Sequence, residues 1–249
     1  MVKLLEVCVD SLASARAAIQ GGADRLELCS ALAVGGLTPY RALLSQIRQE
    51  SGIPIRCLIR PRAGDFLYSS EEIRLMALQI EDLKDAGANG FVIGCLTPDG
   101  KLDEAALSPL MHAAGNRPLT LHRAIDVSMD PEETYLAAGA LGFDTVLTSG
   151  CAANCTAGKE TIEKLLSLRD SGQGPEVLIG AGVNAAVIST FRQALPQARA
   201  FHMSGKTELE SGMVFRRTGV PMGLPGLDEW HVQQTDPLAI AAARAALDA

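Results

Sequence analysis

The sequence lacks the features that would tie it to a nucleic acid or a membrane. It contains no run of Lys and Arg, and its 249 residues carry a formal net charge of −7. Proteins that hold a phosphate backbone or an acidic membrane surface concentrate positive charge, so neither partner is expected. No apolar run approaches the ~18 residues of a membrane span. The N-terminal residues also lack the apolar core and cleavage site of a signal peptide. We therefore expect a cytoplasmic protein.

The six cysteines are expected to be free thiols, because the cytoplasm keeps thiols reduced. The composition, 47% hydrophobic and 20% charged, is sufficient to bury a sizeable core. Barrels of this length commonly form one domain, so we expect a single domain over residues 1–249.

Strand and helix patterns alternate along the whole chain. The predicted strands are Lys3–Val9, Arg25–Cys29, Ile55–Arg60, Gly90–Gly94, Leu119–His122, Thr145–Thr148, Val177–Gly180 and Arg199–Met203. The predicted helices are Ser11–Gln20, Pro39–Glu50, Ser70–Ala86, Asp103–Ala114, Pro131–Ala140, Lys159–Asp170, Asn184–Ala194 and Asp236–Leu247.

The spacing of helix-ending glycines predicts the fold. Gly22, Gly87 and Gly142 each precede a turn into the next strand, and they lie about two βα units apart, with about 30 residues to a unit. Eight such units form a (β/α)8 TIM barrel, an α/β fold. The competing fold is an open doubly wound sheet, but its marker Gly-x-Gly-x-x-Gly does not follow the first strand.

Strand parity predicts a polar ring inside the barrel. Side chains alternate across a strand, so a strand whose apolar residues face the helices turns its other residues inward. The chemically active residues predicted to face inward are Glu6, Cys8, Glu27, Cys29, Arg60, His122 and His202. A barrel interior is normally filled with branched apolar side chains, and an unpaired buried charge is costly. The ring therefore pairs internally or binds a ligand.

The fifth predicted strand ends in a cluster of chemically useful residues. It turns polar within two residues and delivers His122, Arg123 and Asp126, which are a base, a cation and a carboxylate. Parallel α/β folds keep their sites at this end of their strands.

Other loops are predicted to contribute residues to the same end of the barrel, at the carboxyl ends of the strands. Arg60 and Arg62 follow the third strand and form a fork suited to a carboxylate or a phosphate. Gly182 and Ser204 follow the seventh and eighth strands, where many barrels bind phosphate through backbone N–H groups. Residues 206–234 show weak periodicity, and we interpret them as an irregular lid or oligomer contact.

Several motifs resemble those of the CutC-type copper homeostasis protein family. They occur in the family's order and are Glu6-Val-Cys8-Val-Asp-Ser, Gly22-Ala-Asp-Arg-Leu-Glu-Leu-Cys29, Gly35-Gly-Leu-Thr-Pro39, Ile59-Arg-Pro-Arg-Ala-Gly-Asp-Phe66, His122-Arg-Ala-Ile-Asp126, Val146-Leu-Thr-Ser-Gly150 and Ser211-Gly-Met213. Ala63 stands where a second glycine is usual, and Ile125 where phenylalanine is usual. The resemblance implies a cytosolic (β/α)8 barrel, often oligomeric, that is linked to copper tolerance and binds Cu(I).

By this resemblance the copper ligands are Cys8 and Cys29. Both are predicted to face inward, and strand spacing would place them about 5 Å apart. Cu(I) is a soft ion that prefers thiolates, so two thiolates could hold one ion. A buried free cysteine also commonly serves as a small apolar filler, and that alternative stays open.

The charged ring supports a second interpretation, because a set of Arg, His and Glu suits an anionic metabolite better than Cu(I). The chain would then be a lyase or isomerase, with His122 or Glu27 carrying a proton and Arg60 clamping the anion. The residues predicted for such a site are His122, Glu27, Arg60 and Asp126 for catalysis, and Arg62, Arg123, Gly182, His202 and Ser204 for ligand binding. The sequence leaves both interpretations open.

Overall fold

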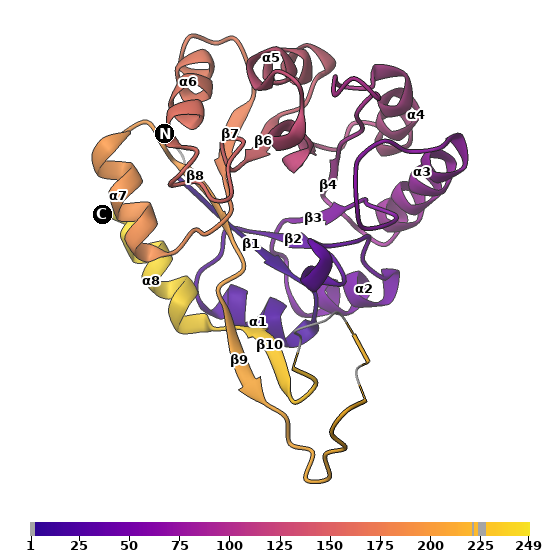
Figure 1. The fold of residues 1–249 in the computed structure, drawn as a ribbon, viewed down its shortest axis with the longest axis vertical. Coiled ribbons are helices and arrows are strands. Elements are labelled where there is room, and N and C mark those ends of the chain that lie inside the picture. The colour runs from indigo at the N-terminus through magenta and orange to yellow at the C-terminus, as the bar shows by residue number, and fades with distance from the viewer. Residues whose placement is uncertain (1–2, 221, 224–227) are drawn as a thin grey trace.

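The described part of the computed structural model, residues 3–220, 222–223 and 228–249, contains a closed barrel of eight parallel strands (Figure 1). The strands follow one another around the barrel in sequence order, which confirms the predicted (β/α)8 fold. They are β1 (Leu4–Val9), β2 (Arg25–Leu28), β3 (Ile55–Leu58), β4 (Gly90–Ile93), β5 (Leu119–Leu121), β6 (Thr145–Thr148), β7 (Glu176–Ile179) and β8 (Ala200–Met203).

The helices surround the barrel, as Figure 1 shows. They are α1 (Leu12–Gln20), α2 (Arg41–Glu50), α3 (Ser70–Asp85), α4 (Glu104–Ala114), α5 (Pro131–Leu141), α6 (Lys159–Asp170), α7 (Ala185–Ala194) and α8 (Pro237–Asp248), with short 3-10 helices η1 (Leu32–Val34) and η2 (Arg123–Val127). Helix α3 begins with a capping box between Ser69 and Glu72, and Asp130 caps α5 ahead of Pro131. Among the described residues, no helix is long and apolar enough to span a membrane.

The inside and outside of the barrel follow the predicted strand parity. Leu5, Val7 and Val9 are fully buried in the layer between the strands and the helices. Cys29 instead packs inside the barrel against Leu58 and Val92. The alternation thus turns Glu6, Cys8 and Glu27 of β1 and β2 inward, where the candidate site lies.

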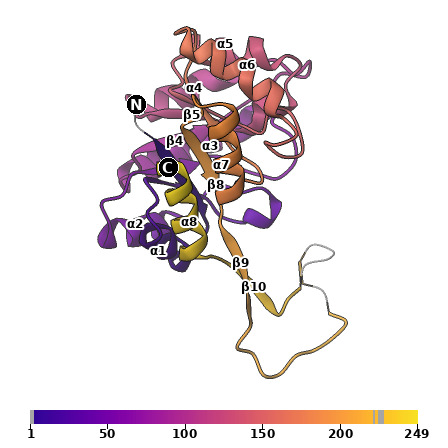
Figure 2. The same ribbon diagram turned by 90° about the vertical axis from the view of Figure 1, so that its left-hand side faces the viewer.

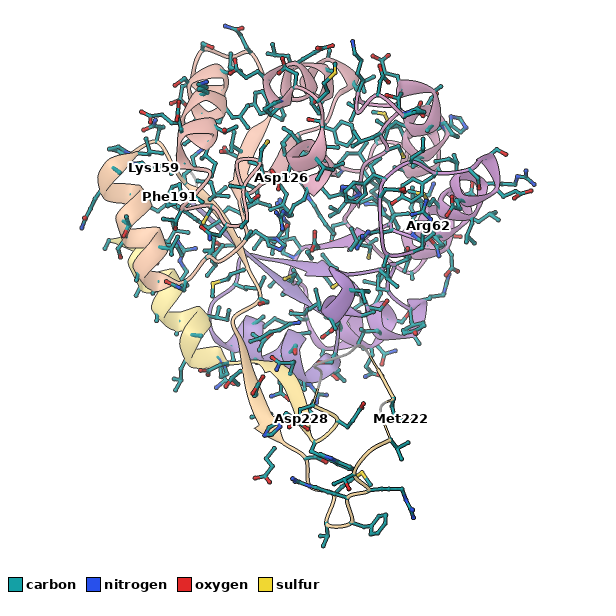
Figure 3. All side chains as sticks on the ribbon, in the orientation of Figure 1. Arg62, Asp126, Lys159, Phe191, Met222 and Asp228 are labelled. Atoms are coloured by element: carbon teal, nitrogen blue, oxygen red, sulfur yellow. The ribbon has the colours of Figure 1, made fainter. Side chains whose placement is uncertain are left out.

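The segment after β8 is not wholly irregular, as its weak periodicity had suggested. Strands β9 (Lys206–Glu210) and β10 (His231–Thr235) pair antiparallel and form the base of an arm that extends away from the barrel (Figures 1 and 2). The pairing was not predicted because the two strands are separated by twenty residues, so no local pattern links them. Met222 and Asp228 lie in this arm, far from the barrel interior (Figure 3). The predicted segment 206–234 also includes residues 221 and 224–227, which lie outside the described part.

Candidate functional site

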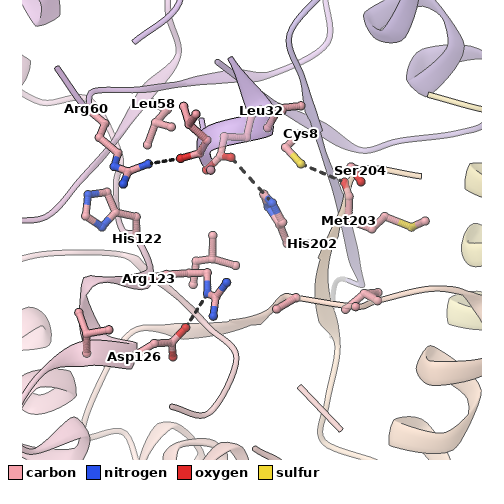
Figure 4. A pocket seen from close by; sticks show the side chains of 18 of the residues that line it. Cys8, Leu32, Leu58, Arg60, His122, Arg123, Asp126, His202, Met203 and Ser204 are labelled. Atoms are coloured by element: carbon pink, nitrogen blue, oxygen red, sulfur yellow. Dashed lines mark hydrogen bonds and ion pairs between the residues drawn. The ribbon is translucent and has the colours of Figure 1, made fainter. Parts of the chain in front are cut away.

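A cavity of about 510 Å³ opens at the carboxyl ends of the barrel strands (Figure 4). It brings together most residues that the sequence predicted for a site, namely Cys8, Glu27, Arg60, His122, Arg123, Asp126, Gly182, His202 and Ser204. Cys29 and Arg62 do not line it, and neither do the described residues of the arm.

His202, at the carboxyl end of β8, connects the cavity to a buried ion pair below it. Its Nδ1 atom lies 2.8 Å from Glu6 Oε1, and its Nε2 atom lies 3.8 Å from Glu27 Oε2. Burial by itself lowers the pKa of His202, but Cys8, Glu27 and the hydrogen bond to Glu6 raise it well above its ordinary value. A carboxylate only accepts hydrogen bonds, so Nδ1 carries a proton and donates a hydrogen bond to Glu6.

Glu6 is fully buried and is held in its charged form by its neighbours. Arg25 Nε lies 2.5 Å from Glu6 Oε2. Burial raises the pKa of Glu6, but Arg25 and His202 together lower it to about 2. The sequence analysis did not predict Arg25 as a site residue. It could have done so, because Arg25 lies two residues before Glu27 on β2 and therefore faces the same side of the strand.

Glu27 differs from Glu6 in its protonation. Burial, which disfavours the carboxylate, and the nearby charge of Glu6 raise the pKa of Glu27 to about 7, against the opposing influence of His202 and Arg25. A carboxyl group with a pKa near neutrality can give up or take up a proton at physiological pH.

Cys8, Glu27 and His202 form the candidate metal centre. One potential ligand atom from each lies within 4.8 Å of the others, and all three side chains are largely removed from solvent. Strand register explains this grouping, because Cys8 lies directly beside Glu27 on the neighbouring strand.

Cys8 and Cys29 are not register partners on β1 and β2, contrary to the predicted equivalence of the two strand ends. The register pairs Val9 with Leu28, so Cys29 lies beyond the last residue of β1. Cys29 Sγ lies 3.4 Å from Val9 O and donates to it. Burial, with the charges of Cys8 and Glu27, raises the pKa of the Cys29 thiol well above its ordinary value. Cys29 has the surroundings of a buried apolar filler and does not belong to the Cys8, Glu27 and His202 cluster. Its role as a copper ligand stays a prediction.

Arg60 and His122 lie together on another part of the cavity wall (Figure 4). Among the described residues Arg60 forms no ion pair, whereas the buried carboxylate of Glu6 is paired with Arg25. Its guanidinium donates to the carbonyl oxygens of Val34, Gly36 and Gly64.

His122 is a neutral hydrogen-bond donor. Its Nδ1 atom accepts from the backbone N–H of Ala124 at 3.2 Å, so the ring proton lies on Nε2. Burial and then the charge of Arg60 lower the pKa of His122 to about 3. The Nε2 atom is buried and has no partner among the described residues.

Asp126 serves as an anchor rather than as a free base. Its carboxylate accepts from the backbone N–H groups of Ser149 and Cys151 and from the hydroxyl of Thr148. Arg123 Nε donates to Asp126 at 2.7 Å, and Arg123 Nη2 donates to Ser149 Oγ. These bonds hold the loop after β6 in place, and the catalytic role that the sequence suggested for Asp126 stays a prediction.

The predicted fork of Arg60 and Arg62 does not form. Arg62 Nε binds Glu72 Oε1 at 2.6 Å, and the side chain lies toward α3, away from the cavity (Figure 3). Glu72 belongs to the first turn of α3, so Arg62 forms its ion pair with the N-terminal end of that helix. Gly182, in the left-handed backbone region at φ +80°, and Ser204 do line the cavity, at the ends of β7 and β8.

Known proteins are similar to this chain in sequence and in fold over most of its length. It is 40% identical to the copper homeostasis protein cutC homolog of Homo sapiens, over 94% of this chain and 85% of that protein. It is also 40% identical to a family protein CutC of Chromobacterium violaceum, over 100% of this chain and 99% of that protein. The crystal structure of CutC from Streptococcus agalactiae superimposes with a TM-score of 0.76 at 28% identity, covering 82% of this chain and 99% of that one. With a match to the CutC family over residues 3–207, this chain belongs to the CutC family.

Proposed function

We propose that this protein handles copper by binding one Cu(I) ion through Cys8 and His202, with Glu27 as an adjacent third ligand. The orientation of His202 carries the proposal. Its Nδ1 is held by Glu6, while Nε2 faces the cavity beside Glu27 and within the same cluster as Cys8. Metal-binding histidines are commonly fixed in this way, with the second ring nitrogen donating to a carboxylate.

The donor set suits copper in its reduced state. A thiolate and an imidazole are ligands that Cu(I) accepts, and their burial excludes most of the water that would compete. Because the pKa of His202 is raised, its Nε2 would release a proton when the ion binds. The name of the human relative, a copper homeostasis protein, favours copper among the metals that such ligands could hold. We place this chemistry in the cytoplasm, where Cys8 would stay reduced.

The test is an anaerobic competition titration of the reduced protein against a Cu(I) chelator. The variants Cys8→Ser and His202→Ala should each weaken Cu(I) binding strongly. Cys29→Ser is the matched control, because it changes a neighbouring buried thiol that lies outside the cluster, and it should leave the affinity unchanged.

Two results would contradict the proposal. Equal loss of Cu(I) binding in Cys8→Ser and Cys29→Ser would assign the metal to the paired thiols instead. Tighter binding of Zn(II) than of Cu(I), relative to chelators of known affinity, would exclude copper as the preferred ion, since Cys, His and Glu are also ligands of Zn(II).

One observation favours a second candidate, a lyase or isomerase that acts on a small anion. Glu27, with a pKa of about 7, lines the same cavity as Arg60, which forms no ion pair with any residue that the structure describes. A carboxyl group that can exchange a proton, in one cavity with a fixed positive charge, is the combination expected for proton transfer on an anionic substrate. This candidate requires a small anion to bind inside the cavity.

A further inference from the structure

Arg60 presents hydrogen-bond donors that find no acceptor among the described residues. Nη1 donates to Val34 and Gly36, and Nη2 donates to Gly64, so three of the five N–H groups of the guanidinium have acceptors. The remaining two include the Nε–H, and the Nε atom is buried with no hydrogen-bond partner in the part of the chain that the structure describes. A buried donor without an acceptor is uncommon in native proteins and requires a reason.

His122 supplies another free donor on the same wall. Its Nε2–H is buried and has no acceptor among residues 3–220, 222–223 and 228–249, and the residue is only 4% exposed. The Phe66 ring packs against both residues, with its centroid 4.5 Å from that of His122 and 5.4 Å from Arg60 Cζ. Figure 4 shows the guanidinium of Arg60 beside the imidazole of His122.

The charges around the cavity determine which ligand fits these donors. Arg123 is neutralised by Asp126, whereas Arg60 has no carboxylate partner among the described residues. His122 is neutral, so this wall carries one uncompensated positive charge. A singly charged oxyanion would neutralise it, while a phosphate dianion would leave a second buried charge without a partner.

We propose that Arg60 and His122 form a binding site for the carboxylate group of a small organic acid. One carboxylate oxygen accepts from Arg60 and the other from the Nε2–H of His122. The apolar side chains of Leu58, Phe66 and Leu147 line the same cavity, whose volume of about 510 Å³ accommodates a small molecule. This site is separate from the copper ligands and does not depend on the proposed metal binding.

The experiment is isothermal titration calorimetry of the metal-free protein with pyruvate at neutral pH. Inorganic phosphate and sodium chloride of matched ionic strength are the comparison titrants. His122→Phe keeps a ring against Phe66 and removes the Nε2 donor, while Arg60→Lys keeps the charge and removes the free Nε–H. Each variant should bind pyruvate at least about tenfold more weakly, because a hydrogen bond to a charged group is lost.

Arg62→Lys is the control, since this neighbouring guanidinium lies outside the cavity, and its pyruvate affinity should equal that of the wild type. Arg60→Lys loses the hydrogen bonds to three backbone carbonyl groups, so circular dichroism is used to check that this variant folds. If Arg60→Lys does not fold, His122→Phe still tests the site. The proposal is overturned if pyruvate does not bind at millimolar concentration, or if His122→Phe binds it as well as wild type. Tighter, competitive binding of phosphate would overturn the assignment to carboxylates. Because the protein is metal-free, each of these results leaves the copper proposal to its own test.

Discussion

The ion pair of Arg25 and Glu6 beneath the cavity is expected to contribute strongly to stability, and Arg25→Met tests this. The substitution removes the guanidinium that lies 2.5 Å from a fully buried carboxylate. It leaves Glu6 with His202 as its remaining direct partner. Breaking a buried pair by removing one partner typically costs roughly 3–5 kcal/mol, because the other charge stays buried and poorly compensated.

The pKa of Glu6 gives a magnitude of the same order. Its lowering from 4.5 to about 2 corresponds to about 3 kcal/mol of stability. Because the folded-state pKa is the lower one, this contribution is fully present above about pH 4.5 and is lost as the pH falls toward 2. Arg25→Met should therefore be most destabilising at neutral pH, and less so in acid, where Glu6 is protonated.

The assay is urea unfolding of the wild type, Arg25→Met and the double variant Glu6→Gln/Arg25→Met across this pH range. The double variant should recover much of the loss at neutral pH, since the buried carboxylate that lost its arginine is removed and the amide carbonyl that replaces it can still accept from His202 Nδ1. Arg16→Met is the matched control, because Arg16 forms its 2.7 Å ion pair with Glu50 at the surface, and it should not change stability measurably. An Arg25→Met variant no less stable than Arg16→Met would refute the reasoning.

Two further predictions follow from the protonation of Glu27 and from the arm. The metal-free wild type should lose about 3 kcal/mol as the pH rises from about 4.5 through about 7, because the raised pKa of Glu27 favours folding only while the group is protonated. Glu27→Gln should abolish this loss in the same urea titrations, and an unchanged pH profile would contradict the assignment. We also propose that the arm, which exposes Val214 fully and Phe215 by 68%, contacts a second copy of this chain. Light scattering after gel filtration should then give a multiple of 26.2 kDa for the wild type and about 26.2 kDa for Val214→Asp/Phe215→Asp, and a monomeric wild type would contradict the proposal.

Much of the cavity could be predicted from sequence because it depends on local periodicities. The alternation of apolar strands with amphipathic helices, spaced by helix-ending glycines, is sufficient to predict the barrel. The two-residue period of strands then predicts that Glu6, Cys8 and Glu27 face inward. The position of His122 at the end of β5 follows from the same rule. These features need no knowledge of which strands finally touch.

The tertiary structure alone decided which of those residues meet and in which charge state. Closing a barrel staggers neighbouring strands, so Cys8 lies beside Glu27 rather than beside Cys29, and parity cannot reveal this stagger. Glu6 and His202 are 196 residues apart in the sequence, and only barrel closure brings them into a hydrogen bond.

Burial and neighbouring charge then separate residues that look alike in the sequence. Glu6 and Glu27 are both inward carboxylates, yet the pKa is about 2 for the one beside Arg25 and about 7 for the other. Arg60 and Arg62 follow the same strand, but Glu72 at the start of α3 draws Arg62 away from the cavity. The sequence determined which side chains reach the barrel interior, and the three-dimensional packing determined their partners, because pKa and pairing depend on distances that no local pattern encodes.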